Sequence, residues 1–212
     1  MRYATHAPMK NVLLAGFEPF GGGRVNPSEL AVRALDQRVI ARHRIVSIVL
    51  PCVFRSSIGV LERAIRRARP VLVICVGQAA GRAAIELERV AINVDDAPSA
   101  DNAGKQPIDR PIERSGPAAY WSTLPIKSIQ TALRRNGLPA NVSLSAGTFV
   151  CNHVFYGLMH ALRRKDGVRG GFVHVPILPQ QAKKGMRSLS LPKTVRALEI
   201  VVRTSIRKGR AG

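Results

Sequence analysis

An unbroken apolar run, PVLVICVG at residues 70–77, limits the folds that this chain can adopt. A strand without polar alternation is typical of the interior of a parallel sheet, where helices cover both faces. Comparable β-rich runs at 11–17, 44–50 and 170–178 alternate with helical patterns, and no repeat or low-complexity tract interrupts them. This order of elements predicts an α/β fold.

The boundaries of several elements are marked by their residues. Asn26 is expected to cap the first helix, with Pro27 at its first position. Residues 84–93 alternate like a half-exposed strand or hairpin, and residues 94–115, rich in Asp, Pro, Gly and Asn, are expected to form a long loop. Further helices are expected at 55–68, 126–136, 152–165 and 192–208, and a further strand at 142–150.

The chain is long enough for one compact domain. A natural first strand opens just after Met9, so residues 9–212 are expected to form a single α/β domain, with residues 1–8 as an extension outside the fold. The apolar run near the N-terminus spans only about five residues, too short for a signal-peptide core or a membrane span. We therefore expect no membrane association.

The high positive charge raises the hypothesis of nucleic-acid binding. Lys and Arg number 33 against 13 Asp and Glu, a formal net charge of +20. However, the basic residues recur along helical patterns opposite apolar faces, as on solvated helix surfaces. Aromatic residues are only 5% of the chain, and neither a base-stacking signature nor paired zinc-ligand spacing occurs. These features argue against nucleic-acid binding as the main function.

The three cysteines cannot all pair within the chain and are too scattered for the disulfide framework of a small secreted protein. They are interpreted as free thiols of a cytoplasmic protein. Cys75 lies inside the apolar run at 70–77 and is expected to be an inert core thiol. Cys151 is different, because it lies where an expected strand passes into an expected helix, and the free N–H groups of a helix start favour a thiolate.

A catalytic thiolate needs a histidine nearby. His153 and His160 share the helix of Cys151 but are poorly placed by spacing, since side chains two residues apart diverge and nine residues exceed two turns. His174, at the end of an expected strand, is the better candidate, because chemistry in α/β sheets gathers beyond the carboxyl ends of strands. A lone cysteine after an apolar run is otherwise more often a core residue.

A third group should orient the imidazole. Glu86 and Glu88, two residues apart on one expected strand, point to the same face and are both candidates. Composition does not choose between them. A metal site is not expected, because Asp95, Asp96 and Asp101 lie in a loop rich in Pro and Gly, where acidic residues usually form turns. The glycine-rich loop at 16–28 lacks the residues of a nucleotide-binding motif.

Seven blocks of the sequence together resemble the pyroglutamyl-peptidase (pyrrolidone-carboxylate peptidase) family, in order from about Asn11 to Leu191. The resemblance implies a cysteine omega peptidase that removes an N-terminal pyroglutamyl residue from peptides, without metal or cofactor. It also implies a three-layer α/β/α sandwich around a mixed, largely parallel twisted sheet, and a homotetramer. Carried over by motif, the implied catalytic residues are Cys151, His174 and Glu88. The blocks are LLAGFEPFGGGRVNPS, VICVGQAAGR, ERVAINVDDA, DNAGKQPID, GPAAYWSTLPIK, AGTFVCNHVFYGLMH and RGGFVHVPILPQQ.

The five-membered lactam of pyroglutamate calls for a flat apolar slot with a few polar groups. Phe17 and Phe20 are candidates for the slot, although both also fit as aromatics that anchor a loop. Asn26 equally fits as a helix cap. The full set of candidate substrate-binding residues is Phe17, Phe20, Asn26, Gln78, Phe149 and Val150.

One position departs from the family pattern. Pro98 stands where relatives commonly carry arginine, which puts in doubt any help from that arginine in loop closure or oxyanion binding. The high positive charge is also unusual for the family. The competing hypothesis is therefore a catalytically weakened scaffold that acts as a basic binding protein for acidic peptides or nucleic acid.

Overall fold

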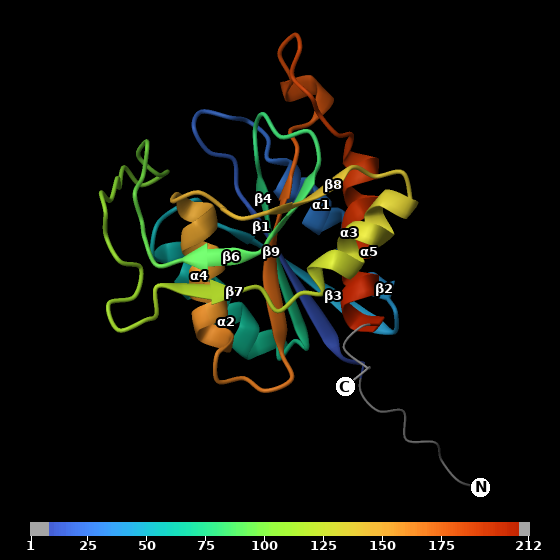
Figure 1. The fold of residues 1–212 in the computed structure, drawn as a ribbon, viewed down its shortest axis with the longest axis horizontal. Coiled ribbons are helices and arrows are strands. Elements are labelled where there is room, and N and C mark those ends of the chain that lie inside the picture. The colour runs from blue at the N-terminus through green and yellow to red at the C-terminus, as the bar shows by residue number, and fades with distance from the viewer. Residues whose placement is uncertain (1–8, 208–212) are drawn as a thin grey trace, which may run out of the picture.

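A seven-stranded sheet forms the centre of the computed structural model, which describes residues 9–207 (Figure 1). The strand order is β2-β3-β1-β4-β9-β5-β8. The expected extension at residues 1–8 lies outside the described residues, as does Lys208 at the end of the last expected helix. The strands are β1 (Asn11–Phe17), β2 (Val39–Ile40), β3 (His43–Leu50), β4 (Leu72–Gln78), β5 (Ile85–Glu88), β8 (Ala140–Ser143) and β9 (Arg169–Val175).

The sheet is mixed and largely parallel, as predicted. Strands β3, β1, β4 and β9 run parallel to one another. Strands β5 and β8 are parallel to each other but antiparallel to β9, and the short β2 is antiparallel to β3. Strand β9 is therefore the boundary between the parallel half of the sheet and the half that runs the other way.

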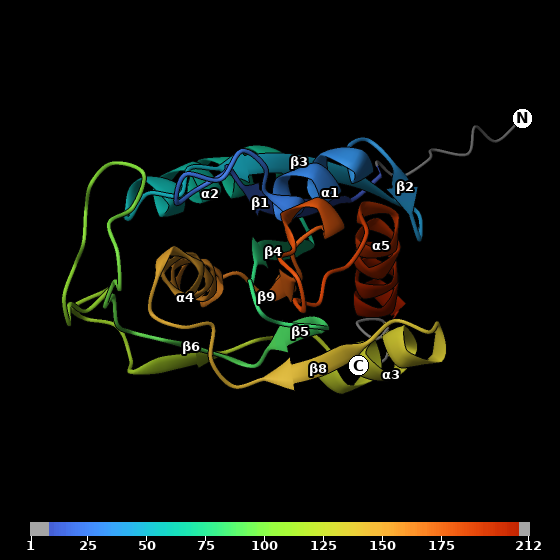
Figure 2. The same cartoon turned by 90° about the horizontal axis from the view of Figure 1, so that it is seen from above.

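Helices cover both faces of the sheet and give three layers (Figure 2). One layer holds α1, α3 and α5, and the other holds α2 and α4. Alternate residues of β1 serve the two cores: Val12 and Leu14 pack under α1 and α5, whereas Leu13 and Ala15 pack under α2 and α4. The helices are α1 (Pro27–Leu35), α2 (Ser56–Ala68), α3 (Ile126–Arg135), α4 (Val150–Leu162) and α5 (Leu191–Arg207), with a 3₁₀ turn at Pro179–Gln181.

Two expectations about strands were wrong. The strand expected at 142–150 ends at Ser143, and residues 144–149 form a loop in which Gly147 has a φ of 76°. The strand or hairpin expected at 84–93 breaks at Arg89 into two strands of different sheets. Its second part, β6 (Val90–Ile92), pairs with β7 (Ala119–Trp121) in a small separate sheet beside α4.

The long loop was expected at the correct place, after residue 93. Within the described residues, the only β-bridge in this loop joins Asp95 to Arg110. No helix in residues 9–207 is both long enough and apolar enough to cross a membrane.

Candidate active site

A buried carboxylate–imidazole pair joins β5 to β9. Glu88 Oε1 lies 2.7 Å from His174 Nδ1, with Glu88 fully buried and His174 4% exposed. In the antiparallel register Glu88 is opposite Phe172, and His174 is the diagonal neighbour two residues further along the same face. Glu86 is directly opposite His174, but its carboxylate accepts from Asn141 instead. The imidazole is therefore oriented by Glu88.

Cys151 reaches this pair from a helix and not from a strand end. It is the second residue of α4, after the loop at 144–149, so the expectation that a strand leads directly into it was wrong. A Cβ atom at Gly77 would lie 2.9 Å from Cys151 Sγ, and Gly77 pairs with His174 across β4 and β9. The thiol thus lies against the strand next to the imidazole. Within residues 9–207 the thiol and the imidazole form no hydrogen bond.

The environment of the thiol does not favour its ionisation in isolation. Burial raises the pKa of the Cys151 thiol above its ordinary value, and the nearby Cys52 and Glu88 raise it further, whereas the Arg82 cation lowers it. A half-buried thiol with a raised pKa becomes a nucleophile only when a base accepts its proton. The imidazole of His174 is the nearby group that fits this role.

Arg82 is a third partner of the pair that the sequence reasoning missed. Its Nη1 lies 3.0 Å from Glu88 Oε1, the same oxygen that faces His174, and 3.2 Å from Ser143 Oγ. Its Nη2 donates to the carbonyl oxygen of Ser145. Glu88 Oε2 is buried without a hydrogen-bond partner. One arginine therefore links the carboxylate to the loop that leads to Cys151, and no sequence signal separated it from the other basic residues.

The two excluded histidines have other partners. His153 Nδ1 lies 2.9 Å from Asp95 Oδ2, and its Nε2 accepts from the backbone N–H of Arg55. His160 Nδ1 lies 2.9 Å from the Tyr120 hydroxyl. Burial and the Arg163 cation lower the pKa of His160. Neither imidazole is bonded to Cys151.

The acidic residues of the long loop shape its backbone. Asp101 accepts from the backbone N–H groups of Phe54, Ala103 and Lys105, and Asp95 holds His153. Within residues 9–207 no group of three or more His, Cys, Asp or Glu side chains is arranged to hold a metal ion.

Some of the expected substrate-binding side chains form an aromatic cluster before Cys151. Phe20 and Phe149 are half-buried, with ring centroids 6.4 Å apart. Phe54, which the sequence reasoning missed, packs edge-on against Phe149 at 5.5 Å. Gln78, at the end of β4, accepts from Gln181. Phe20, Phe149 and Gln78 are partly accessible, whereas Phe54 is buried.

The other three expected residues lie in the interior. Phe17 is 2% exposed and its ring packs 6.2 Å from that of Phe172. Val150 is fully buried in the core under α2 and α4. Asn26 is the N-cap of α1, accepts from the Ser28 N–H and donates to the Glu18 carbonyl. Asn26 therefore caps α1, as one of its two interpretations predicted.

Comparison with known proteins assigns the chain to a family. The family model described as pyroglutamyl peptidase matches residues 10–208. The chain belongs to this family. A pyrrolidone-carboxylate peptidase of Bacillus cereus (strain G9842) is 52% identical over 197 residues, which cover 92% of this chain and 92% of that protein.

Solved structures of the pyroglutamyl-peptidase family share the fold. The crystal structure of Bacillus amyloliquefaciens pyroglutamyl peptidase I matches with a TM-score of 0.92 at 48% identity, covering 94% of this chain and 98% of that one. A mutant pyrrolidone carboxyl peptidase from Pyrococcus furiosus matches with a TM-score of 0.90 at 39% identity, covering 93% and 99%. The expected family, the α/β/α fold and the enzyme class, a peptidase, are confirmed.

Proposed function

We propose that this chain hydrolyses the amide bond after an N-terminal pyroglutamyl residue, with Cys151 as nucleophile, His174 as acid and base, and Glu88 as the orienting group. Family membership supports the reaction. The observation that carries the residue roles is the buried 2.7 Å contact between Glu88 and His174, with the Cys151 thiol packed against the neighbouring strand at Gly77.

The proposed reaction passes through a thioester on Cys151. His174 accepts the thiol proton, and the Cys151 thiolate attacks the carbonyl carbon that joins pyroglutamate to the next residue. The imidazolium then protonates the departing amine, which leaves a thioester on Cys151. Water activated by His174 hydrolyses the thioester and releases pyroglutamate. The proposed steps use protein groups and water alone, with no metal or cofactor.

Two further elements stabilise charge in this proposal. Glu88 holds the Nδ1 proton of His174 and stabilises the imidazolium. The backbone N–H of Cys151, in the first turn of α4, is suited to the tetrahedral oxyanion because the start of a helix leaves such groups without intrahelical partners. Arg82 balances the Glu88 charge and lowers the pKa of the thiol.

We assign the lactam slot to the half-buried rings of Phe20 and Phe149, with Phe54 as support behind Phe149. Gln78 is the proposed polar partner at the end of β4. Phe20 and Phe149 pack against the core cluster that contains Phe17 and Val150, so we assign those two residues to the support of the slot. Asn26 instead caps α1. We also infer a cytoplasmic homotetramer, which sedimentation velocity and fractionation of cells would test.

The first test compares release of a fluorescent amine from a pyroglutamyl amide and from the matching prolyl amide. The wild type is expected to cleave only the pyroglutamyl amide. Cys151→Ala is expected to lose this activity, whereas Cys75→Ala, which alters a fully buried thiol of β4, keeps it. A folded wild type without activity would favour the alternative of a weakened binding protein, with Pro98 in the exposed loop as the first position to examine.

A further inference from the structure

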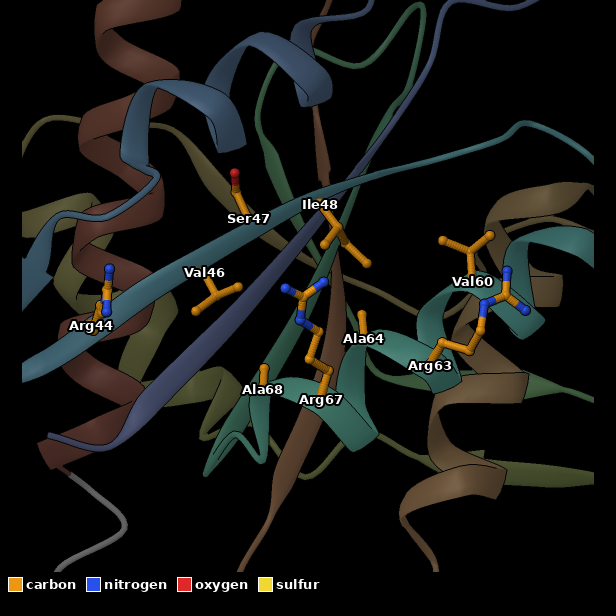
Figure 3. Close-up of a pocket in the computed structure, with 9 residues that line it drawn as sticks. All are labelled: Arg44, Val46, Ser47, Ile48, Val60, Arg63, Ala64, Arg67 and Ala68. Carbon is orange, nitrogen blue, oxygen red and sulfur yellow. The ribbon is translucent and has the colours of Figure 1, made fainter. Parts of the chain in front are cut away.

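A groove outside the proposed active site lies between β3 and α2 (Figure 3). Its volume is about 770 Å³. The floor is apolar, and it is formed by Val46 and Ile48 of β3 together with Val60 and Ala64 of α2. None of these residues belongs to the proposed catalytic group. The groove therefore needs an explanation of its own.

Three arginines surround this apolar floor. Arg44 lies at the β3 end of the groove, and Arg63 and Arg67 extend from α2 (Figure 3). All three residues are exposed. Within residues 9–207 none of these three arginines forms a salt bridge: Arg44 donates to the neutral Gln37 side chain, and Glu62 of α2 pairs with Arg66. The groove thus presents uncompensated cations beside apolar surface.

The edge of β3 beside the groove is only partly covered. Strand β2 pairs with β3 at His43 and Arg44 alone. On the side of β3 that faces away from β1, the N–H of Ile45 donates to the Arg38 carbonyl, and the N–H of Ser47 donates to Asp36 Oδ1. By strand alternation the next outward N–H is that of Val49, and it has no backbone partner within the described residues.

We propose that this groove binds an extended peptide segment, from a partner protein, that carries both apolar and acidic side chains. The free edge at Val49 supplies main-chain hydrogen bonds, as in strand addition. The apolar floor accepts the aliphatic side chains, and the arginines pair with carboxylates at the rim. A second copy of this chain docked through the same groove would bring the same three arginines to the rim and no carboxylate, so it fits less well than an acidic peptide.

The test measures fluorescence anisotropy with a labelled, N-acetylated peptide in which Val and Leu residues are flanked by Glu on both sides. The acetyl group keeps the peptide from presenting a pyroglutamyl terminus to the active site. Arg63→Glu with Arg67→Glu is expected to weaken binding at least tenfold. The matched control, Arg135→Glu with Arg203→Glu on α3 and α5, carries the same charge change on exposed residues and is expected to have less than a threefold effect.

A second variant separates the groove from general polyanion binding. Val60→Ser keeps the charge and removes part of the apolar floor, so it is expected to weaken peptide binding at least threefold. Equal loss in the control pair, or single-stranded DNA that binds as tightly and ignores Val60→Ser, would overturn the proposal. So would sedimentation showing that the groove variants abolish self-association of the wild type. Unchanged circular dichroism and amide hydrolysis establish that each variant is folded.

Discussion

Replacing Arg82 with glutamine removes the cation that shares Glu88 Oε1 with His174. Because this cation lowers the pKa of the Cys151 thiol, its loss raises that pKa and makes the thiolate harder to form. The acidic limb of the pH profile of kcat/KM reports formation of the reactive thiolate. We therefore expect this limb to move to higher pH in Arg82→Gln.

The size of the shift follows from Coulomb's law. A unit charge on the order of 8 Å from a thiolate, at an effective dielectric constant of about 20 to 40, contributes about 1 to 2 kcal/mol. Arg82 is 33% exposed, so solvent screening reduces this value. The expected shift is about 0.5 to 1 pH unit.

The assay is the pH dependence of pyroglutamyl amide hydrolysis between about pH 5 and pH 10. Arg82→Lys keeps the charge but not the two-armed contact with the loop at Ser143 and Ser145, so it is expected to lower kcat while leaving the limb in place. Arg33→Gln removes an equal charge from an exposed ion pair on α1 and is expected to change neither. An unmoved limb in Arg82→Gln would refute the electrostatic role, even if kcat fell.

Two further substitutions test the packing around the site. Gly77→Ala places a Cβ 2.9 Å from Cys151 Sγ and 2.8 Å from Phe172 Cζ. It is expected to lower kcat/KM at least tenfold and to lower the free energy of unfolding in urea by about 1 to 3 kcal/mol. In the control Gly59→Ala on α2, the new Cβ has ordinary clearance, so no loss of stability is expected. Asp101→Ala removes an acceptor of three backbone N–H groups and is expected to cost about 1 to 3 kcal/mol at pH 7. Burial raises the pKa of Asp101, but these hydrogen bonds outweigh burial and hold that pKa below its ordinary value. The wild type should therefore lose this contribution as the pH falls below about 4, and a difference in Tm that persists there would contradict it.

The parts of the fold that the sequence predicted have local causes. The apolar strands β1, β4 and β9 and the capped start of α1 carry their signals within a few neighbouring residues. The strand expected at 142–150 was wrong in its second half. Phe149 and Val150, with the residues before them, resemble a strand in sequence, but Gly147 has a positive φ and the chain turns there toward α4. The short β7 lacks a periodic signal of its own, since its pairing with β6 is what defines it.

The residues of the proposed site also differ in how far the sequence reveals them. Cysteine and histidine are rare enough to stand out, so Cys151 and His174 could be chosen by residue type and position. Arg82 and Phe54 could not, because their roles depend on contacts with Glu88 and Phe149 across the fold. Composition left Glu86 and Glu88 equal, and only the family resemblance pointed to Glu88. The physical reason lies in the register of β5 against β9, which places Glu88 diagonally from His174.

In α/β sheets, functional residues gather at the carboxyl ends of strands. The change of strand direction at β9 explains why this expectation was correct for His174 and wrong for Cys151. His174 lies near the carboxyl end of a strand that is parallel to β4, where the expectation applies. Strand β8 runs the opposite way, so its end does not reach the same edge, and the chain needs the loop at 144–149 and the first turn of α4 to bring Cys151 to Gly77. The same reversal places Glu88 diagonally from His174. The antiparallel half of the sheet thus supplies the carboxylate that we propose orients the imidazole, and the helix start supplies the proposed nucleophile together with its proposed oxyanion donor.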